Sequence, residues 1–332
     1  MPADPIHYAT YFDRHYLTRG LALYRSLERH SPPFVLWVLC LDDETQRTLS
    51  RLRLEQVELI PLAELERADP ALLTVKPTRQ PVEYYWTSGP AFLAYLFDCQ
   101  AEIELLTYLD ADLFFFRDPL PLYRELAGGS ILIIEHRYSH RVPNEISARV
   151  WGIYNVGFLA FRRSPVGLAC LRLWREQCLD WCFYRHEPGR CADQMYLDGW
   201  PERFEGVVTA RHKGAGLAPW NLDNHRPSFG SGVAWVDEDP LIFYHFSWLR
   251  VINRWLYDPG LWRFCATMGP TVKRSIYGPY ARELRTAGDS IRAVGGRVQP
   301  VDNLLHGRNR LLSLARMVRH GSFLVVTDRF AL

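Results

Sequence analysis

Two aspartates separated by one alanine, Asp110, Ala111 and Asp112, lie between two apolar runs near the middle of the chain. Residues 105–109 and 113–116 form these runs, which are typical of buried strands. Because an isolated charge is not buried without a partner, we expect both aspartates where a strand ends and the sheet opens. Two carboxylates on a short turn suit Mn²⁺ or Mg²⁺, and such an ion can also hold a diphosphate. The alternative is a helix cap at Asp110 and a surface turn residue at Asp112.

The elements before this D-x-D turn (residues 110–112) read as an alternation of strands and helices. Strands are predicted at 6–10, 34–41 and 57–60, and helices at 18–29 and from residue 42 onward. This order opens a doubly wound nucleotide-binding sheet, in which ligands bind at the carboxyl ends of the strands. No G-x-G-x-x-G stands in the first strand-to-helix turn, which argues against a dinucleotide dehydrogenase.

The alternation continues on both sides of the D-x-D turn. Pro90 is predicted to open a helix over 91–99 that leads into the strand at 105–109. The later predicted elements are strands at 131–134, 154–161 and 207–208 and a helix at 168–182. The segment 241–244 is predicted to be the last strand of the chain, and His245 follows it directly. The polar and basic loop at 138–153 is long for the interior of a domain, which is typical of a functional or mobile segment.

Composition places the chain among ordinary globular proteins. Its 332 residues suffice for one large α/β domain with an appendage or for two domains. A net charge of +2 does not point to nucleic acid, so we expect no nucleic-acid partner. Aromatic residues make up 14% of the chain, as is common where sugar rings bind, although large cores also use them.

The cysteines and the N-terminus indicate a cytoplasmic protein. Cys178, Cys182 and Cys191 form the one cluster among seven cysteines, and their spacing fits no common zinc pattern, so reduced thiols are expected. Residues 1–7 lack the charged and apolar regions of a signal peptide. No apolar run approaches about 20 residues, so no membrane-spanning helix is expected.

The last part of the chain differs in charge from the rest. From about Met268, Lys and Arg outnumber Asp and Glu, which predicts a domain over 1–267 and a basic helical extension over 268–332. Residues 304–319 combine five leucines with four arginines. Such a segment either lies on an anionic membrane surface or packs its leucines on the core.

Taken in order, these features resemble the GT-A glycosyltransferases, in particular the family of glycogenin and the bacterial lipopolysaccharide galactosyl- and glucosyltransferases. The resemblance covers about residues 6–249. It rests on the loop with Tyr16 after the first strand, Asp110-Ala111-Asp112, Asn155-Val156-Gly157, Asp193-Gln194, and a late strand that ends at His245. It implies a Rossmann-like α/β fold, with a mostly parallel central sheet and helices on both faces, that transfers sugar from a nucleotide-diphosphate sugar.

The resemblance also implies a role for each matched residue. Asp110, Asp112 and His245 would bind Mn²⁺ or Mg²⁺, with Ala111 between the carboxylates. Asp193 and Gln194 would act beside the anomeric carbon, where a carboxylate stabilises an oxocarbenium-like transition state. The donor would further contact Thr10, Tyr11 and Tyr16 around the base, Arg79 at the diphosphate, and Asn155 and Gly157 at the sugar.

Each of these residues also has an ordinary structural interpretation. His245 could be a core or capping histidine, and Arg79 a surface arginine. Gly157 could be a strand kink, and Asp193 could cap a helix. Simple packing would explain Thr10, Tyr11 and Tyr16.

The sequence departs from the family at one motif. The family usually ends its core with H-x-x-G-x-x-K-P-W, whereas Phe246, Ser247 and Trp248 follow His245 here. The lysine that would contact the departing diphosphate is therefore unassigned, with Lys213 as a candidate. Retention of the anomeric configuration stays open for the same reason.

Three other protein classes remain as alternatives. A nucleotidyltransferase of the same fold would need a glycine-rich basic loop near the N-terminus, and a D-x-D phosphatase would place the motif on its first strand. A non-catalytic sugar- or nucleotide-binding protein is the third. For the transferase, UDP is the nucleotide that the resemblance favours. The acceptor would be a glycan, glycolipid or protein, with the loop 136–149 and Trp181, Trp200 and Trp248 as candidate acceptor surfaces.

Overall fold

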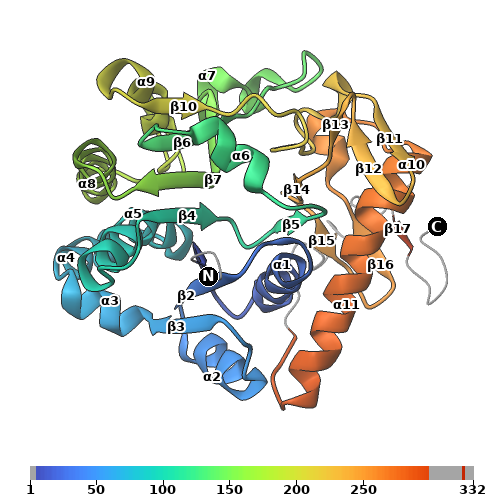
Figure 1. The fold of residues 1–332 in the computed structure, drawn as a ribbon. Coiled ribbons are helices and arrows are strands. Elements are labelled where there is room, and N and C mark those ends of the chain that lie inside the picture. The colour runs from blue at the N-terminus through green and yellow to red at the C-terminus, as the bar shows by residue number, and fades with distance from the viewer. Residues whose placement is uncertain (1–4, 299–323, 326–332) are drawn as a thin grey trace.

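A computed structural model of the protein describes residues 5–298 and 324–325, and its centre is a seven-stranded sheet (Figure 1). The strand order is β10-β6-β7-β4-β1-β2-β3. The strands are β1 (Ile6–Phe12), β2 (Phe34–Cys40), β3 (Val57–Pro61), β4 (Leu105–Leu109), β6 (Ile131–Glu135), β7 (Tyr154–Arg162) and β10 (Val207–Thr209). All neighbours pair in parallel except β7, which runs antiparallel to both β4 and β6. The predicted α/β class with a mostly parallel sheet is confirmed.

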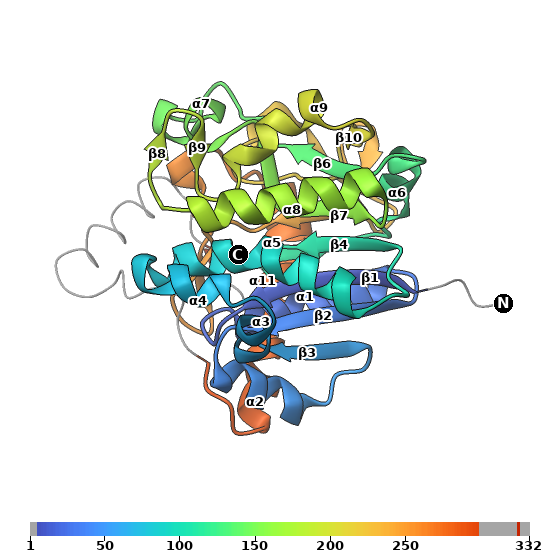
Figure 2. The ribbon, with the colours of Figure 1, turned by 90° about the vertical axis from the view of Figure 1, so that its left-hand side faces the viewer.

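Helices cover both faces of the sheet because successive side chains of a strand point to opposite faces. Ala9 and Trp37 pack with α5 (Pro81–Cys99) and α8 (Pro165–Asp180), which lie in front of the sheet in Figure 2. Tyr8 and Leu36, one residue earlier in each strand, pack on the other face. That face is covered by α1 (Leu17–His30), α2 (Asp43–Leu52), α6 (Leu120–Leu126) and α11 (Gly278–Ala293).

The helix before the D-x-D turn begins earlier than predicted. It starts at Pro81, where the backbone N–H of Gln80 donates to Glu83 at 2.7 Å and closes the first turn. Pro90 lies inside this helix and does not open it, so that prediction was wrong. The 19-residue length and the buried side chains on both halves of α5 show why: packing on the sheet outweighs the hydrogen bond that proline cannot donate.

The antiparallel direction of β7 decides where its polar residues lie. In its pairing with β4, Leu109 faces Phe158 and Leu105 faces Arg162. The first residues of β7 therefore lie at the same sheet edge as the last residues of β4. This places Asn155 and Gly157 next to the D-x-D turn, although they begin their strand and the aspartates follow theirs.

The strand that ends at His245 lies outside the central sheet. It is β14 (Phe243–His245), which pairs antiparallel with β5 (Leu113–Phe115), the strand that follows the D-x-D turn. Its prediction as the last strand was wrong, because β15 (Arg250–Val251), β16 (Leu256–Asp258) and β17 (Leu324–Val325) form a further small sheet.

Short elements complete the described chain. The predicted loop 138–153 contains η2 (Asn144–Ile146) and α7 (Ala148–Trp151). The others are α3 (Leu62–Ala68), α4 (Ala71–Val75), η1 (Lys76–Thr78), β8 (His186–Glu187), β9 (Arg190–Cys191), η3 (Met195–Gly199), α9 (Trp200–Arg203), η4 (Leu222–Asn224), β11 (Pro227–Gly230), β12 (Val233–Val236), β13 (Asp239–Pro240), η5 (Leu261–Phe264), α10 (Pro270–Val272) and η6 (Lys273–Tyr277).

The first part of the predicted extension packs tightly on the core. In α11, Glu283 accepts hydrogen bonds from Arg25 at 3.0 Å and Arg29 at 2.7 Å, both on α1. Tyr277 shares a 2.9 Å hydroxyl–hydroxyl hydrogen bond with Tyr244 of β14. The boundary at 267/268 stays a prediction, and the leucine- and arginine-rich segment 304–319 lies outside the described residues.

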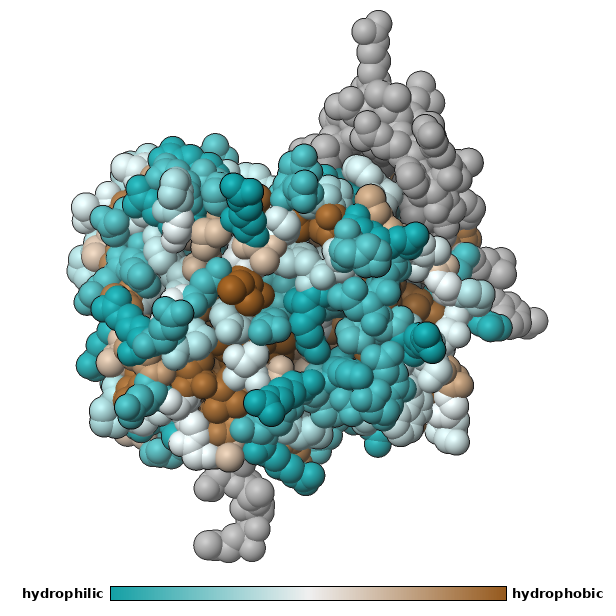
Figure 3. All heavy atoms as spheres, turned by 90° about the horizontal axis from the view of Figure 1, so that it is seen from above, coloured by the Kyte–Doolittle hydropathy of each residue, from teal (hydrophilic) through white to brown (hydrophobic). Residues whose placement is uncertain are grey.

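The described helices are too short or too polar to cross a membrane. Figure 3 shows one face of the molecule as mostly hydrophilic, with apolar patches set among polar side chains. All seven cysteines are free thiols, and the predicted cluster of Cys178, Cys182 and Cys191 is buried.

Candidate active site

The D-x-D turn joins β4 to β5 and is held by backbone hydrogen bonds. The N–H of Asp110 donates to the carbonyl of Gly157 at 2.9 Å, which continues the β4–β7 ladder by one residue. The N–H of Leu113 donates to the Asp110 carbonyl at 3.1 Å, and that of Phe246 donates to the Asp112 carbonyl at 3.0 Å. Both aspartates are thus fixed just beyond the end of a buried strand, as the flanking apolar runs predict.

Asp110, Asp112 and His245 converge in one cluster. His245 ends β14 opposite Leu113, so the antiparallel pairing brings its ring back over the turn. Its Nε2 lies 3.0 Å from Asp112 Oδ1 and 3.5 Å from Asp110 Oδ2, and one ligand atom from each residue lies within 4.8 Å of the others. Two carboxylates and an imidazole are a donor set that Mn²⁺ accepts, so the residues present fit a divalent ion.

The three groups of this cluster shift each other's pKa. Burial would raise the pKa of Asp112, but the neighbouring His245, with Arg19, brings it below its usual range. Burial would lower the pKa of His245, but both carboxylates raise it above its usual range. Burial raises the pKa of Asp110, and Asp112 adds to that shift. The pattern is that of carboxylates sharing one nearby positive charge, which a bound cation would supply more fully.

Two stacked tyrosines hold the Asp110 carboxylate in place. Tyr108, two residues earlier in β4 and therefore on the same face, donates its hydroxyl to Asp110 Oδ1 at 2.7 Å. The Tyr108 ring stacks on Tyr11 of β1, with ring centroids 5.4 Å apart. A Cβ at Gly89 in α5 would lie 3.0 Å from the Tyr11 ring, so glycine lets this helix approach the pair.

Asn155 is the centre of a side-chain network at the start of β7. Its Nδ2 donates to Gln194 Oε1 at 3.1 Å and lies 3.2 Å from His136 Nε2. Its Oδ1 accepts from the Gly157 N–H at 2.9 Å. Burial lowers the pKa of His136 to about 3, so this ring is neutral, and Nδ1, 3.2 Å from the Ile153 carbonyl, carries the proton. The orientation of the Asn155 amide is therefore determined by its neighbours.

Gly157 is in contact with the metal-ligand candidate. A Cβ at this position would lie 2.6 Å from Asn155 Oδ1 and 2.8 Å from His245 Cε1. Any side chain would push the imidazole or the amide out of place. The glycine of Asn155-Val156-Gly157 is thus required for close packing, which is more specific than a strand kink.

Asp193 is a buried carboxyl group with an unusual pKa. It is 4% exposed, and burial, together with the Asp110 charge, raises its pKa to about 8. Its carbonyl accepts from Trp174 Nε1 at 2.8 Å, whereas no side chain of the described residues donates to its carboxyl oxygens. A buried carboxyl in a polar cluster with a strongly shifted pKa is typical of a functional site.

Two Bacillus subtilis (strain 168) proteins are similar in sequence to this chain over most of its length. The uncharacterized protein YfnF is 35% identical over 253 residues, which cover 74% of this chain and 82% of YfnF. The uncharacterized protein YfnD is 32% identical over 289 residues, which cover 86% of this chain and 91% of YfnD. The chain belongs to the family of YfnF and YfnD. No family model matches it.

Among solved structures, the fold of this YfnF and YfnD relative is that of the GT-A glycosyltransferases. The galactosyltransferase LgtC, in complex with donor and acceptor sugar analogs, matches with a TM-score of 0.50 and 15% identity. The match covers 85% of this chain and 96% of LgtC. It confirms the predicted GT-A fold.

Other predicted site residues of this YfnF and YfnD relative are buried or bonded within the fold. Thr10 is fully buried, and Tyr16 is the N-cap residue of α1. Arg79 donates to the carbonyls of Leu179 at 3.1 Å and Asp180 at 3.3 Å, at the end of α8. Ala111 is buried between the two aspartates.

The structure also shows the surroundings of the candidate residues outside the family motifs. Lys213, the candidate for the missing lysine, pairs with Glu238 at 2.8 Å and Asp237 at 3.5 Å. Trp181 and Trp200 are buried, whereas Trp248 is 38% exposed. Of the three tryptophans, Trp248 alone is exposed, and the Arg263 guanidinium lies over its ring, 3.8 Å from the centroid.

Tyr108, His136 and Trp220 are site residues whose roles the sequence did not indicate. Tyr108 could have been found from its position two residues before Asp110, and His136 from its position just after β6. Trp220 packs edge-on to His245 with ring centroids 5.1 Å apart. It comes from a segment far along the chain, and no local pattern places it there.

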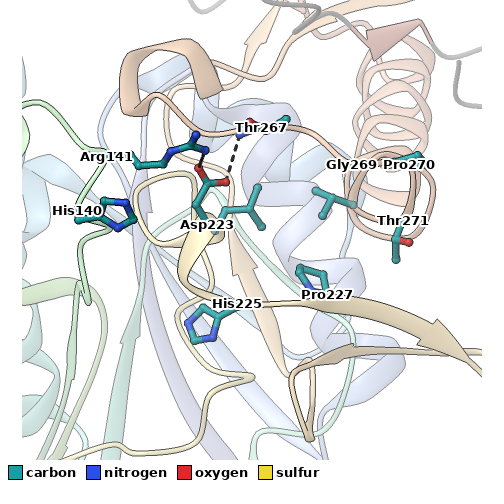
Figure 4. A pocket seen from close by; sticks show the side chains of 11 residues that line it. His140, Arg141, Asp223, His225, Pro227, Thr267, Gly269, Pro270 and Thr271 are labelled. Atoms are coloured by element: carbon teal, nitrogen blue, oxygen red, sulfur yellow. Dashed lines mark hydrogen bonds and ion pairs between the residues drawn. The ribbon is translucent and has the colours of Figure 1, made fainter.

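A separate pocket of about 530 Å³ lies beside the loop 138–153 (Figure 4). His140 and Arg141 of that loop face the start of α10 across it. Arg141 pairs with Asp223 at 2.8 Å, and the other carboxyl oxygen of Asp223 accepts from the Thr267 N–H at 3.3 Å. The lining mixes polar and apolar side chains, and Arg141 and Asp223 in it are paired with each other.

Proposed function

We propose that the protein is a metal-dependent glycosyltransferase. It would move a hexose from a nucleotide-diphosphate sugar, with UDP-sugar the first candidate, to a glycan or glycolipid. The observation that carries this proposal is the cluster of Asp110, Asp112 and His245 on a GT-A fold, with ligand atoms within 4.8 Å of one another. The cluster lies where the carboxyl end of β4 meets the start of β7, which is where open α/β sheets bind ligands.

Asp110, Asp112 and His245 would hold Mn²⁺ or Mg²⁺. When bound, such an ion neutralises charge on a diphosphate leaving group. The carboxylates are already oriented by the backbone bonds of the turn and by Tyr108, so little reorganisation is needed on binding.

The residues at the start of β7 and before η3 would position the sugar. Asn155 and Gln194 hold each other at 3.1 Å, and Gln194 Nε2 also donates to the Trp151 carbonyl at 2.7 Å. A network this constrained can orient a sugar hydroxyl without first ordering its own side chains. Asp193 would stabilise positive charge at the anomeric carbon, which in turn favours its ionised form.

The acceptor would approach from the side of the loop 138–153. This loop contributes His140 and Arg141 to the pocket of Figure 4. Leu222, which also lines the pocket, is two residues from Trp220, the residue packed on His245. A pocket that mixes polar and apolar side chains, with aromatic residues nearby, is suited to a carbohydrate.

The direct test is slow hydrolysis of nucleotide-sugars in the absence of an acceptor. The full chain would be incubated with UDP-, ADP-, GDP-, CDP- and dTDP-sugars and Mn²⁺, with Asp112→Asn as the inactive control. We expect release of free sugar from one nucleotide class, stopped by a chelator and absent in the variant. If the wild-type protein neither hydrolyses nor binds any nucleotide-sugar in the presence of Mn²⁺, a glycosyltransferase function is excluded.

A further inference from the structure

Arg19, in the first turn of α1, is a buried cation whose hydrogen-bonding capacity is mostly unused. It is 1% exposed. One nitrogen, Nη2, donates to the Leu249 carbonyl at 2.5 Å, but Nε and Nη1 have no partner among the described residues. A guanidinium stays charged in proteins, and burial of charged, unpaired donors is unfavourable. Buried donors of this kind are normally satisfied by oxygen acceptors, and a phosphate offers several.

The first turn of α1, which contains Arg19, lacks the side chains that usually neutralise a helix N-terminus. The N-cap residue Tyr16 makes no side-chain capping bond, and the first turn of α1 carries no acidic residue. A helix N-terminus has a partial positive charge, which favours an anion and disfavours a cation. An arginine in the first turn therefore adds to the positive charge of this helix end. Its guanidinium lies over the Tyr16 ring, 4.6 Å from the centroid.

This positive charge faces the D-x-D turn. The Leu249 carbonyl that accepts from Arg19 belongs to the segment after His245. In this segment the Leu249 N–H donates to the Phe246 carbonyl at 3.2 Å, and the Phe246 N–H donates to the Asp112 carbonyl at 3.0 Å. Tyr280 of α11 stacks its ring on Phe246 with centroids 3.7 Å apart, and its buried hydroxyl has no hydrogen-bond partner among the described residues. Three buried polar atoms, Arg19 Nε and Nη1 and the Tyr280 hydroxyl, thus lie unsatisfied beside a candidate metal ligand.

Asp112 does not explain this arrangement as a simple counter-ion. Its carboxylate is paired with His245 at 3.0 Å, and Arg19 forms no ion pair with a carboxylate of the described residues. Arg25, six residues later in the same helix, differs from Arg19 because its guanidinium has side-chain partners. Arg25 is satisfied by Glu283 at 3.0 Å and Ser290 at 2.7 Å.

We propose that Arg19 is an anion-binding residue of the donor site and donates to a phosphate oxygen of the bound nucleotide diphosphate. This inference rests on the proposed function and specifies how the leaving group is held. Charge-assisted bonds from arginine to phosphate are among the stronger hydrogen bonds in proteins. Asp112 and His245, at 8% and 5% exposed, are nearly as covered as Arg19. A diphosphate on a cation held there would lie beside the segment 245–249, whose Leu249 carbonyl already accepts from Arg19 Nη2.

The test measures binding by titration calorimetry in the full chain with Mn²⁺. The ligands are inorganic pyrophosphate, the five nucleoside diphosphates UDP, ADP, GDP, CDP and dTDP, and the nucleoside of whichever binds. The variants are Arg19→Met, which removes the charge, Arg19→Lys, which keeps it, and Arg25→Met as a control on the same helix. We expect Arg19→Met to weaken diphosphate and pyrophosphate binding by about tenfold or more, with nucleoside binding unchanged. Arg19→Lys should lie between Arg19→Met and the wild type.

Thermal stability separates an anion-binding role from a structural one. Because the buried guanidinium is largely unsatisfied, Arg19→Met should melt at or above the wild-type temperature without ligand. Arg25→Met should melt lower and bind diphosphate normally. Equal diphosphate affinity in the wild type and Arg19→Met overturns the inference, as does an equal loss for nucleoside and diphosphate. If Arg19→Met does not fold, Arg19→Lys decides by the same two criteria. A wild-type protein that binds no nucleoside diphosphate overturns the proposed function itself.

Discussion

The D-x-D cluster and the pocket of Figure 4 both gather charged side chains, but they hold them differently. In the pocket, Arg141 is 52% exposed and forms an ordinary ion pair with Asp223, and His225 pairs with Asp237 at 2.9 Å. Asp112 in the cluster and Asp193 near it are almost completely buried. An ion pair with one exposed partner, such as that of Arg141 with Asp223, contributes little to stability.

The difference indicates where the chemistry resides. Buried charged groups lower stability unless their partners are complete, so a fold retains incomplete ones only where a ligand completes them. The raised pKa of Asp193 and the unpaired donors of Arg19 are both signs of this state. The pocket shows neither sign in the charged groups that line it, which fits a surface that recognises an acceptor more than one that performs catalysis.

Removal of one aspartate from the turn should have the largest effect. Asp110→Asn or Asp112→Asn should reduce sugar transfer or nucleotide-sugar hydrolysis by roughly a hundredfold to a thousandfold, because metal-based charge stabilisation contributes several kcal/mol. The fold, followed by circular dichroism, should be unchanged. Asp223→Asn in the pocket is the matched control and should leave hydrolysis intact. Near wild-type turnover of either turn variant in the presence of chelator would contradict the metal site.

Asp193→Asn should separate turnover from binding. Its kcat should fall by about a hundredfold, while the affinity for nucleoside diphosphate changes little, because the carboxylate acts mainly in the transition state. Steady-state kinetics together with titration of the diphosphate would measure both. Equal losses in kcat and in binding would instead indicate a structural role in holding the segment near Trp174.

His245→Ala should weaken the affinity for Mn²⁺ by about tenfold or more, because the cluster loses its nitrogen ligand. In the wild type, Mn²⁺ affinity should fall as the medium is acidified, since the imidazole and carboxylates must lose protons to bind. Mn²⁺ titration at several pH values tests both statements. His225→Ala in the pocket should bind Mn²⁺ as the wild type does. Unchanged metal affinity in His245→Ala would make this histidine a packing residue.

The pKa of Asp193 predicts a pH-dependent stability difference. A carboxyl whose pKa is raised to about 8 in the folded state and is near 3.9 when unfolded favours folding only while protonated. Its destabilising effect therefore begins as pH rises above about 4 and is complete above about 8, where it reaches several kcal/mol at most. Asp193→Asn should unfold at higher denaturant than the wild type at pH 9, with the difference shrinking toward pH 4. A constant difference would show that Asp193 is not held protonated.

The smallest effect is expected in the pocket of Figure 4. Arg141→Ala removes an exposed ion pair and should change the free energy of unfolding by at most about 1 kcal/mol. If the pocket binds the acceptor, the same variant should raise KM for the acceptor without altering hydrolysis of the donor. A large loss of donor hydrolysis would place the pocket within the donor site and remove the contrast between the two regions.

Much of this fold could be predicted from local sequence. The apolar runs on both sides of Asp110 predicted strands and a turn at the sheet edge, and β4 and β5 lie there. Asp42 caps α2 by accepting from the Thr45 N–H at 2.8 Å, near the predicted helix start. The helix start predicted at Pro90 was wrong. That prediction used only the local preference of proline for the first helical turn, whereas packing along the whole of α5 stabilises the helix on both sides of Pro90.

The candidate site itself was only partly predictable. Asp110, Asp112 and His245 converge as the order of motifs suggested. Tyr108 and Trp220 were missed because an aromatic residue in a strand or loop is by default a core residue. Arg19 carries one signal that could have been noticed. It lies four residues before Leu23 and eight before Leu27, on the buried stripe of α1.

The sequence alone determined which segments become strands and helices and that two carboxylates stand at a strand end, because these follow from hydrophobic periodicity and the cost of burying charge. Only the tertiary structure decided that β7 runs antiparallel to β4 and that β14 pairs with β5. These pairings bring Asn155 and His245 to Asp110 from 45 and 135 positions away in the printed numbering. Strand direction and partner choice depend on contacts between distant segments, and a local pattern does not contain them.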